Sequence, residues 1–324
     1  MNRRRLSAIG SHGQGPSKAS DRRRRVPMRC ASRFGNHHSA CICAMLLLIS
    51  ILVLLLSALG RPEPANAAEP VLVIADDAGE RRFTAADLLA KSADVNVDGN
   101  GDIYHHAVRY RAVPLLSLLG TNSNDRLDTV EAHASDGFVS EIPLALAAQG
   151  VSGGAVAWLA VEDPAHPWPT LPHKTETAGP FYLVWEHPER SGVTREQWPY
   201  QLVRLSLVAS PARRWPQLSV SANVPYASFA WHGLDVFVAQ CLPCHRMNGG
   251  GVSEIGPDLG RPMNPTQYLT EAGLRAIIRS PQAVRAWPGQ QMIGFSNTTL
   301  PDADLDALVA YLRAMAEKTG AVSP

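Results

Sequence analysis

Apolar residues follow two different patterns in this chain of 324 residues. Before residue 211, short runs rich in β-branched and aromatic residues are bounded by Pro, Gly, Asn and Asp, which is typical of strands and turns. These runs are 71–74, 155–161, 181–185 and 202–208. After residue 225 the pattern is helical, over 227–240, 271–279 and 302–316. A pattern that changes at a Pro-rich junction predicts two domains.

We therefore predict a multidomain protein. An α+β or mainly β domain is expected over 68–210, a linker over 211–224 and an all-α domain over 225–320. Short helices are expected in the first domain. Thr84, with Asp87 three residues on, predicts an N-cap for a helix over 85–91, and a second helix should begin near Pro114 and end at Gly120.

Residues 1–67 have the composition of an export segment. They contain eleven basic and two acidic residues, a net charge of 11 − 2 = +9, followed by an apolar run over 40–59 and by Ala65-Asn66-Ala67. This order indicates a secretory signal peptide cleaved after Ala67. The alternative is an uncleaved membrane anchor, because the apolar run is long enough to span a bilayer. Either alternative predicts a periplasmic location for residues 68–324.

The overall charge of +1 conceals this basic leader. Residues 68–324 carry 30 − 11 = 19 basic and 29 − 2 = 27 acidic residues, a net charge of −8. We expect no nucleic-acid partner for such a protein. A membrane would be a partner only if the leader stays attached.

Only two of the five cysteines, Cys241 and Cys244, lie after the leader, so no disulfide framework is expected. They belong to Cys241-Leu242-Pro243-Cys244-His245, which is the attachment motif of c-type haem. Each thiol can form a thioether with a haem vinyl group, and His245 then becomes the proximal iron ligand. The competing interpretations are a redox dithiol and half of a zinc site, and zinc would need two further ligands.

Residues 225–318 resemble the class I monohaem cytochrome c family. Gly233 and Phe237 precede the motif where that family packs its first helix against its last, and the apolar face of 302–316 matches. Gly256-Pro257-Asp258-Leu259 corresponds to the family's Gly-Pro-x-Leu. The resemblance implies that the Pro257 carbonyl accepts the ring N–H of His245, a bond that would fix the imidazole.

The second iron ligand must approach from the other side of the haem. Met247 is too near His245, Met263 precedes the central helix and Met315 lies within the last helix. Met292 stands where the family places its axial Met, so the resemblance implies ligation by Met292. The chain departs from the family at Ile293, where Pro is common, and at Pro301, where Ser or Thr is common. We expect both departures to loosen the Met292 loop.

Ligation by His and Met leaves no open position for a substrate on the iron. Our first hypothesis is therefore an exported carrier or electron-transfer subunit with one covalent haem c, docked to a periplasmic dehydrogenase or oxidase. We expect an exposed thioether edge near Leu242 and Pro243, and docking through an apolar rim at Pro243, Gln291 and Ile293. Two alternatives remain open: an enzyme whose N-terminal domain oxidises a small substrate, and a gas sensor in which Met292 dissociates.

Residues 80–210 resemble the molybdopterin-binding domain of the sulfite oxidase family. The similar segments are 110–115, 134–144 and 179–184. The domain lacks the Cys that this family uses to bind molybdenum, because there is no Cys between residues 68 and 240. The resemblance therefore implies a scaffold for docking or small-molecule binding. Residues 94–102 match the first half of a calcium loop, but the loop is incomplete and a hairpin turn is the simpler interpretation.

Overall fold

The computed structural model describes residues 69–98, 103–119, 126–172 and 174–320. Residues 68–324 form one compact unit. The leader, including the apolar run over 40–59, lies outside the described residues. None of the described helices is both long and apolar enough to cross a membrane.

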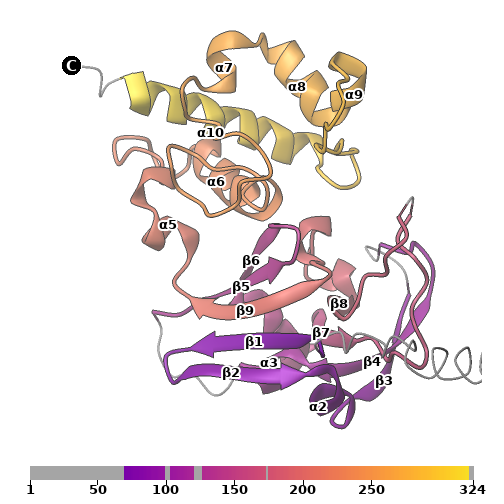
Figure 1. Cartoon of the computed structure of the whole chain (residues 1–324). Helices are drawn as coiled ribbons and strands as arrows, with labels where there is room; N and C mark the ends of the chain where they lie inside the picture. The colour runs from indigo at the N-terminus through magenta and orange to yellow at the C-terminus, as the bar shows by residue number, and fades with distance from the viewer. Residues whose placement is uncertain (1–68, 99–102, 120–125, 173, 321–324) are drawn as a thin grey trace, which may run out of the picture. The chain divides into compact units, whose positions relative to one another are not determined.

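The N-terminal region contains two sheets (Figure 1). The five-stranded sheet has the order β2-β1-β9-β5-β6, and the four-stranded sheet has the order β3-β4-β7-β8. Strand β1 is parallel to β9, and the other pairs are antiparallel. The strands are β1 (Val71–Asp76), β2 (Gly79–Thr84), β3 (Ala93–Val97), β4 (Val108–Pro114), β5 (Thr129–Ala134), β6 (Val139–Pro143), β7 (Val156–Val161), β8 (Phe181–Glu186) and β9 (Leu202–Val208).

One hydrophobic core holds the two sheets together. Its largest side chains are Trp185, Tyr182, Phe181 and Tyr110, all buried. Strand β8 is buried on both faces because Phe181–Trp185 is a continuous apolar run. The predicted sheet-rich region is therefore present.

Short helices connect the strands of this region. The predicted cap at Thr84 is confirmed: its side chain and that of Asp87 form a capping box on α2 (Ala85–Leu89). The other short helices are α3 (Leu115–Leu118), α4 (Leu144–Ala147), η1 (Gln149–Ser152), η2 (Pro188–Arg190) and η3 (Arg195–Gln197).

The segment that matches half of a calcium loop begins in strand β3, which pairs with β4. Its residues 99–102 lie outside the described part of the chain. Among the described residues, no group of three or more His, Cys, Asp or Glu side chains is placed to hold a metal ion.

Residues 211–224, predicted as a linker, contain α5 (Pro211–Arg214) and η4 (Pro216–Leu218). Leu218 is buried in the core of the helical region, and the Tyr311 hydroxyl donates to its carbonyl at 2.8 Å. The Arg214 guanidinium donates to Glu131 and Glu141, which face each other across β5 and β6. The segment therefore binds to both folded regions.

The C-terminal region is helical, as predicted. Its helices are α6 (Phe229–Gln240), α7 (Pro265–Tyr268), α8 (Glu271–Arg279), α9 (Pro281–Val284) and α10 (Asp302–Gly320). Helix α10 lies against α6 (Figure 1). Gly233 allows this approach, because a Cβ there would lie 2.0 Å from the Ala307 carbonyl oxygen. The Phe237 and Tyr311 rings meet with centroids 5.2 Å apart.

Candidate haem site

The Cys241–His245 motif forms a tight turn at the C-terminus of α6. The Cys241 N–H donates to the Phe237 carbonyl at 2.9 Å and ends the helix. The N–H groups of Cys244 and His245 both donate to the Cys241 carbonyl, at 3.1 and 2.8 Å. Both cysteines are free of disulfides and partly exposed. The turn therefore collects two available thiols and one imidazole within five residues.

The His245 imidazole is held in a defined tautomer. Its Nδ1 lies 2.8 Å from the Pro257 carbonyl oxygen. A carbonyl can only accept, so Nδ1 carries the hydrogen and Nε2 keeps the lone pair that binds a metal. Burial lowers the pKa of His245, while the Pro257 carbonyl acts in the opposite direction. A neutral imidazole with a free Nε2 is the form that ligates iron.

Gly256 lets the chain pass close to that imidazole. A Cβ at this position would lie 2.5 Å from Cε1 and 2.6 Å from Nδ1 of His245. The Gly256 N–H also donates to the Cys244 carbonyl at 2.7 Å, which ties the returning chain to the motif. Only glycine fits here, because any side chain would displace the ring.

The loop that carries Pro257 is organised around the carboxylate of Asp258. It accepts hydrogen bonds from the backbone N–H groups of Asn248, Gly249 and Gly260, at 2.9, 2.6 and 2.8 Å. A carboxylate that accepts several backbone N–H groups holds a loop in one conformation. Asp258 therefore positions the Pro257 carbonyl.

Side-chain hydrogen bonds hold the backbone of the Met292 loop, both at Met292 and at residues that follow it. The Gln282 side chain donates to the Met292 carbonyl at 3.0 Å. Arg279 donates to the carbonyls of Phe295 and Leu300, at 3.1 and 2.6 Å. These bonds restrain the segment that we expected Ile293 and Pro301 to loosen.

The other methionines of the helical region have different surroundings. Met247 and Met315 are fully buried in its core, and Met263 is half exposed. Met292 is partly exposed and outside any helix. Ligation by Met292 stays a prediction.

The surroundings of the two thiols favour their protonated form. Burial, followed by the charge of Glu196, raises the pKa of Cys241, and it raises the pKa of Cys244 to about 12. A redox dithiol or a zinc thiolate is favoured by a lowered thiol pKa. The donor set therefore fits a covalent haem.

The expectation of an exposed thioether edge near Leu242 and Pro243 is wrong. Only 3% of Leu242 is exposed, and Pro243 is buried. The N–H of Val139, at the start of β6, donates to the Pro243 carbonyl at 3.3 Å. Ser253 donates to the Gly137 carbonyl at 3.3 Å. The sheet region covers this edge, which no local sequence pattern could reveal.

The rest of the predicted docking rim is exposed. Gln291 and Ile293 both face solvent. With Pro243 buried, the rim that we expected around three residues is reduced to the Met292 loop.

Sequence reasoning missed several residues that support the site. Gln282 and Arg279 bond to backbone carbonyls, and such bonds leave no spacing pattern in a sequence. Asp258 stands inside the quoted Gly-Pro-Asp-Leu motif, where its position next to Pro257 was the available indication.

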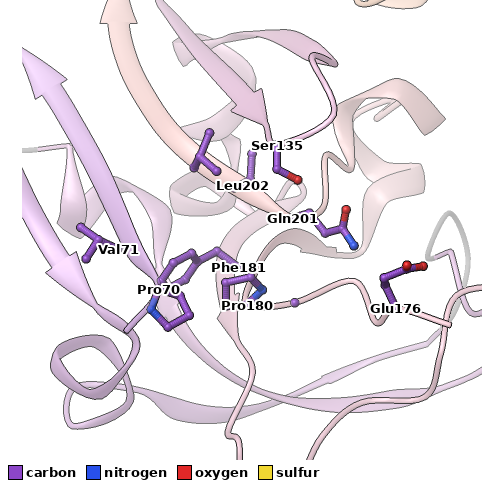
Figure 2. A pocket seen from close by; sticks show the side chains of 10 residues that line it. Pro70, Val71, Ser135, Glu176, Pro180, Phe181, Gln201 and Leu202 are labelled. Carbon is purple, nitrogen blue, oxygen red and sulfur yellow. The ribbon is translucent and has the colours of Figure 1, made fainter. Parts of the chain in front are cut away.

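The N-terminal region contains a separate cavity of about 470 Å³. Figure 2 shows the side chains that line it. Most are apolar, such as Phe181 and Pro180, and the polar ones are Ser135, Glu176 and Gln201. Gln201 has a left-handed backbone, with φ of 52°, and its carbonyl accepts from the Ser135 N–H. Of the haem-site residues that the structure describes, Cys241, Cys244 and His245 do not line this cavity.

Comparison with known proteins identifies the helical region. Residues 232–316 match the model of the family described as Cytochrome c. A search of curated proteins gave no match for the chain. The C-terminal domain is thus a cytochrome c domain, which implies covalently bound haem c and haem-based electron transfer. The comparisons give no support to the sulfite oxidase resemblance of residues 80–210, which stays a prediction.

Proposed function

We propose that this protein is an exported cytochrome that transfers single electrons through one covalent haem c, as a carrier or as the electron-transfer subunit of a periplasmic redox enzyme. Cys241 and Cys244 form the thioethers, and His245 and Met292 ligate the iron. The haem supplies one-electron redox chemistry when it is bound.

The observation that carries this proposal is the hydrogen bond from His245 Nδ1 to the Pro257 carbonyl. It leaves Nε2 as the only ring nitrogen with a free lone pair. The neighbouring turn presents the two thiols on the same few residues. Gly256 and Asp258 hold this arrangement through contacts within the chain, so the chain itself orients the proximal ligand.

The chain also holds the Met292 loop, through Gln282 and Arg279. A thioether sulfur is a neutral ligand, and His/Met ligation raises the reduction potential of a haem. Two protein ligands leave no position for a substrate, so this site favours electron transfer over catalysis on the iron.

The ligation is tested by absorption spectroscopy of the purified protein. The oxidised protein should show the Met–iron charge-transfer band, and Met292→Ala should abolish it. Met263→Ala, at a half-exposed position, is the matched control and should keep the band. A five-coordinate ferrous haem that binds carbon monoxide readily would contradict electron transfer and favour the gas sensor.

The location is tested by cell fractionation. A periplasmic protein whose N-terminus begins after Ala67 supports export with cleavage. Recovery with the membrane supports an anchor at 40–59, and recovery in the cytoplasm contradicts export.

The cavity of the N-terminal region favours one second candidate, a redox enzyme that oxidises a small substrate there. Metal and pterin analysis of the purified protein separates the two. A second redox cofactor bound with the sheet region would support the enzyme, and its absence together with full haem loading would support the electron-transfer role.

A further inference from the structure

The residues around Met292 expose several large apolar side chains to solvent. Val284, the last residue of α9, is 45% exposed, Trp287 is 48% exposed and Ile293 is 41% exposed. Together with Arg285, these residues form what we call the 284–293 patch. Single apolar residues are common on protein surfaces, but apolar side chains that gather in one place mark sites of contact with other molecules.

Hydrogen bonds hold the backbone under this patch. The Arg285 N–H donates to the Pro281 carbonyl at 2.9 Å, which closes the turn of α9. The Gln282 side chain donates to the Met292 carbonyl at 3.0 Å and so ties α9 to the Met292 loop. A surface whose backbone is already held loses less conformational entropy when a partner binds. The patch is therefore suited to form an interface without refolding.

The charge of the patch is positive. Residues 280–301 contain no Asp or Glu. The guanidinium of Arg285 lies over the Trp287 ring, 5.5 Å from its centroid, and forms no ion pair within the described residues. Three other arginines of the helical region each pair with a carboxylate: Arg275, Arg279 and Arg313. An unpaired cation beside apolar side chains complements a partner surface that carries carboxylates.

The patch also lies beside the proposed iron ligand. Ile293 follows Met292 directly, and Trp287 precedes it by five residues. The sheet region covers the edge at Pro243, whose carbonyl accepts from the Val139 N–H at 3.3 Å. A second copy of this chain is a poor occupant, because two identical haems have the same potential and provide no driving force. A different redox protein fits the position.

We propose that the 284–293 patch is the docking surface for the redox partner, a protein whose contact face is apolar and bordered by carboxylates. This inference rests on the proposed function. Trp287 packs into the apolar face, and Arg285 pairs with a carboxylate at its border, since Trp and Arg are enriched among the residues that dominate binding energy. One electron then passes between the haem iron and the partner's cofactor. One centre is oxidised as the other is reduced, and no bond forms or breaks.

The first test is photo-crosslinking in the cells that produce the full chain. Benzoylphenylalanine in place of Val284 should give an adduct with another redox protein, identified by mass spectrometry. The same probe in place of Val151, which is 88% exposed on η1 of the sheet region, should not give that adduct. An adduct only with a second copy, an adduct only with a protein that holds no redox cofactor, or no adduct at Val284 would each overturn the inference.

The second test is the rate of electron transfer between the purified, haem-loaded protein and the crosslinked partner. Trp287→Ala should lower the second-order rate constant about 30-fold, the loss that corresponds to a residue dominating an interface. Arg285→Ala, at an exposed position, should lower it about twofold to fivefold. Tyr268→Ala is the matched control, because Tyr268 is a 59% exposed aromatic residue on α7, and should leave the rate constant unchanged.

The Met–iron charge-transfer band and the reduction potential should be the same in all four proteins, which separates docking from damage to the haem site. A rate constant that neither Trp287→Ala nor Arg285→Ala lowers overturns the inference. In that case a covalent haem with the Met–iron band leaves the electron-transfer function intact. A chain without covalent haem refutes that function itself.

Discussion

Gly233→Ala tests the helix pair that carries the haem site. In a helix interior, alanine is more stable than glycine by about 1 kcal/mol. Here the added Cβ would lie 2.0 Å from the Ala307 carbonyl oxygen and 2.7 Å from Tyr311 Cβ, whereas ordinary contacts begin at 3.4 Å. Helices α6 and α10 would have to separate by 3.4 − 2.0 = 1.4 Å along that direction. The obstacle is backbone, so no side-chain rotation relieves it.

Overpacking of this kind costs about 3 kcal/mol at the upper end of its usual range. After subtracting the gain in helix propensity of about 1 kcal/mol, we expect the free energy of unfolding to fall by about 2 kcal/mol. The assay is urea unfolding of the mature, haem-loaded protein, followed by far-UV circular dichroism and by haem absorbance.

Gly273→Ala is the matched control in α8. Its Cβ would meet only Thr270 Oγ1, at 3.2 Å, so we expect no loss and a gain of up to about 1 kcal/mol. If Gly233→Ala is as stable as the wild type, the close approach of α6 and α10 is wrong.

Three further predictions concern the site and the buried charges. Gly256→Ala should displace the His245 imidazole and shift the haem absorption spectrum at unchanged haem content. An unchanged spectrum would contradict the close contact between Gly256 and the His245 ring. Arg214→Ala should lower the free energy of unfolding by about 3–5 kcal/mol, because the buried carboxylate of Glu131 loses its cation and Glu141 loses a hydrogen-bond donor. Burial raises the pKa of Glu141 to about 8. The contribution of Glu141 to the free energy of unfolding should therefore be complete below about pH 4.5 and decline as the pH rises through 8. Glu141→Gln should flatten that decline in urea titrations at several pH values.

The elements that the sequence predicts best are those with a local pattern. Strand β9 was predicted with the bounds that it has, and helix α8 likewise, because each is a continuous run with one periodicity. Strand β5 was not predicted as a separate run. Its Glu131 and His133 look like solvent-facing residues in the sequence, but Glu131 is buried against Arg214, 83 residues away.

The same distinction applies to the haem site. The cysteines and His245 lie within five residues, and Pro257 follows twelve residues later, so the attachment turn and the carbonyl that bonds to His245 can be proposed from the sequence alone. The N–H that donates to the Pro243 carbonyl belongs to Val139, more than a hundred residues earlier. Such a contact depends on how the domains pack, and neither domain's periodicity encodes it.

The most direct test of the account is the intact mass of the mature protein under denaturing conditions, with a thiol assay on the same sample. A covalent haem predicts a mass higher by one haem than that of the polypeptide alone, with no thiol left to react at Cys241 or Cys244. Replacing both cysteines by serine should remove the added mass. A mature chain with the mass of the polypeptide alone and two reactive thiols, when expressed with a functional haem-attachment system, would contradict the central claim.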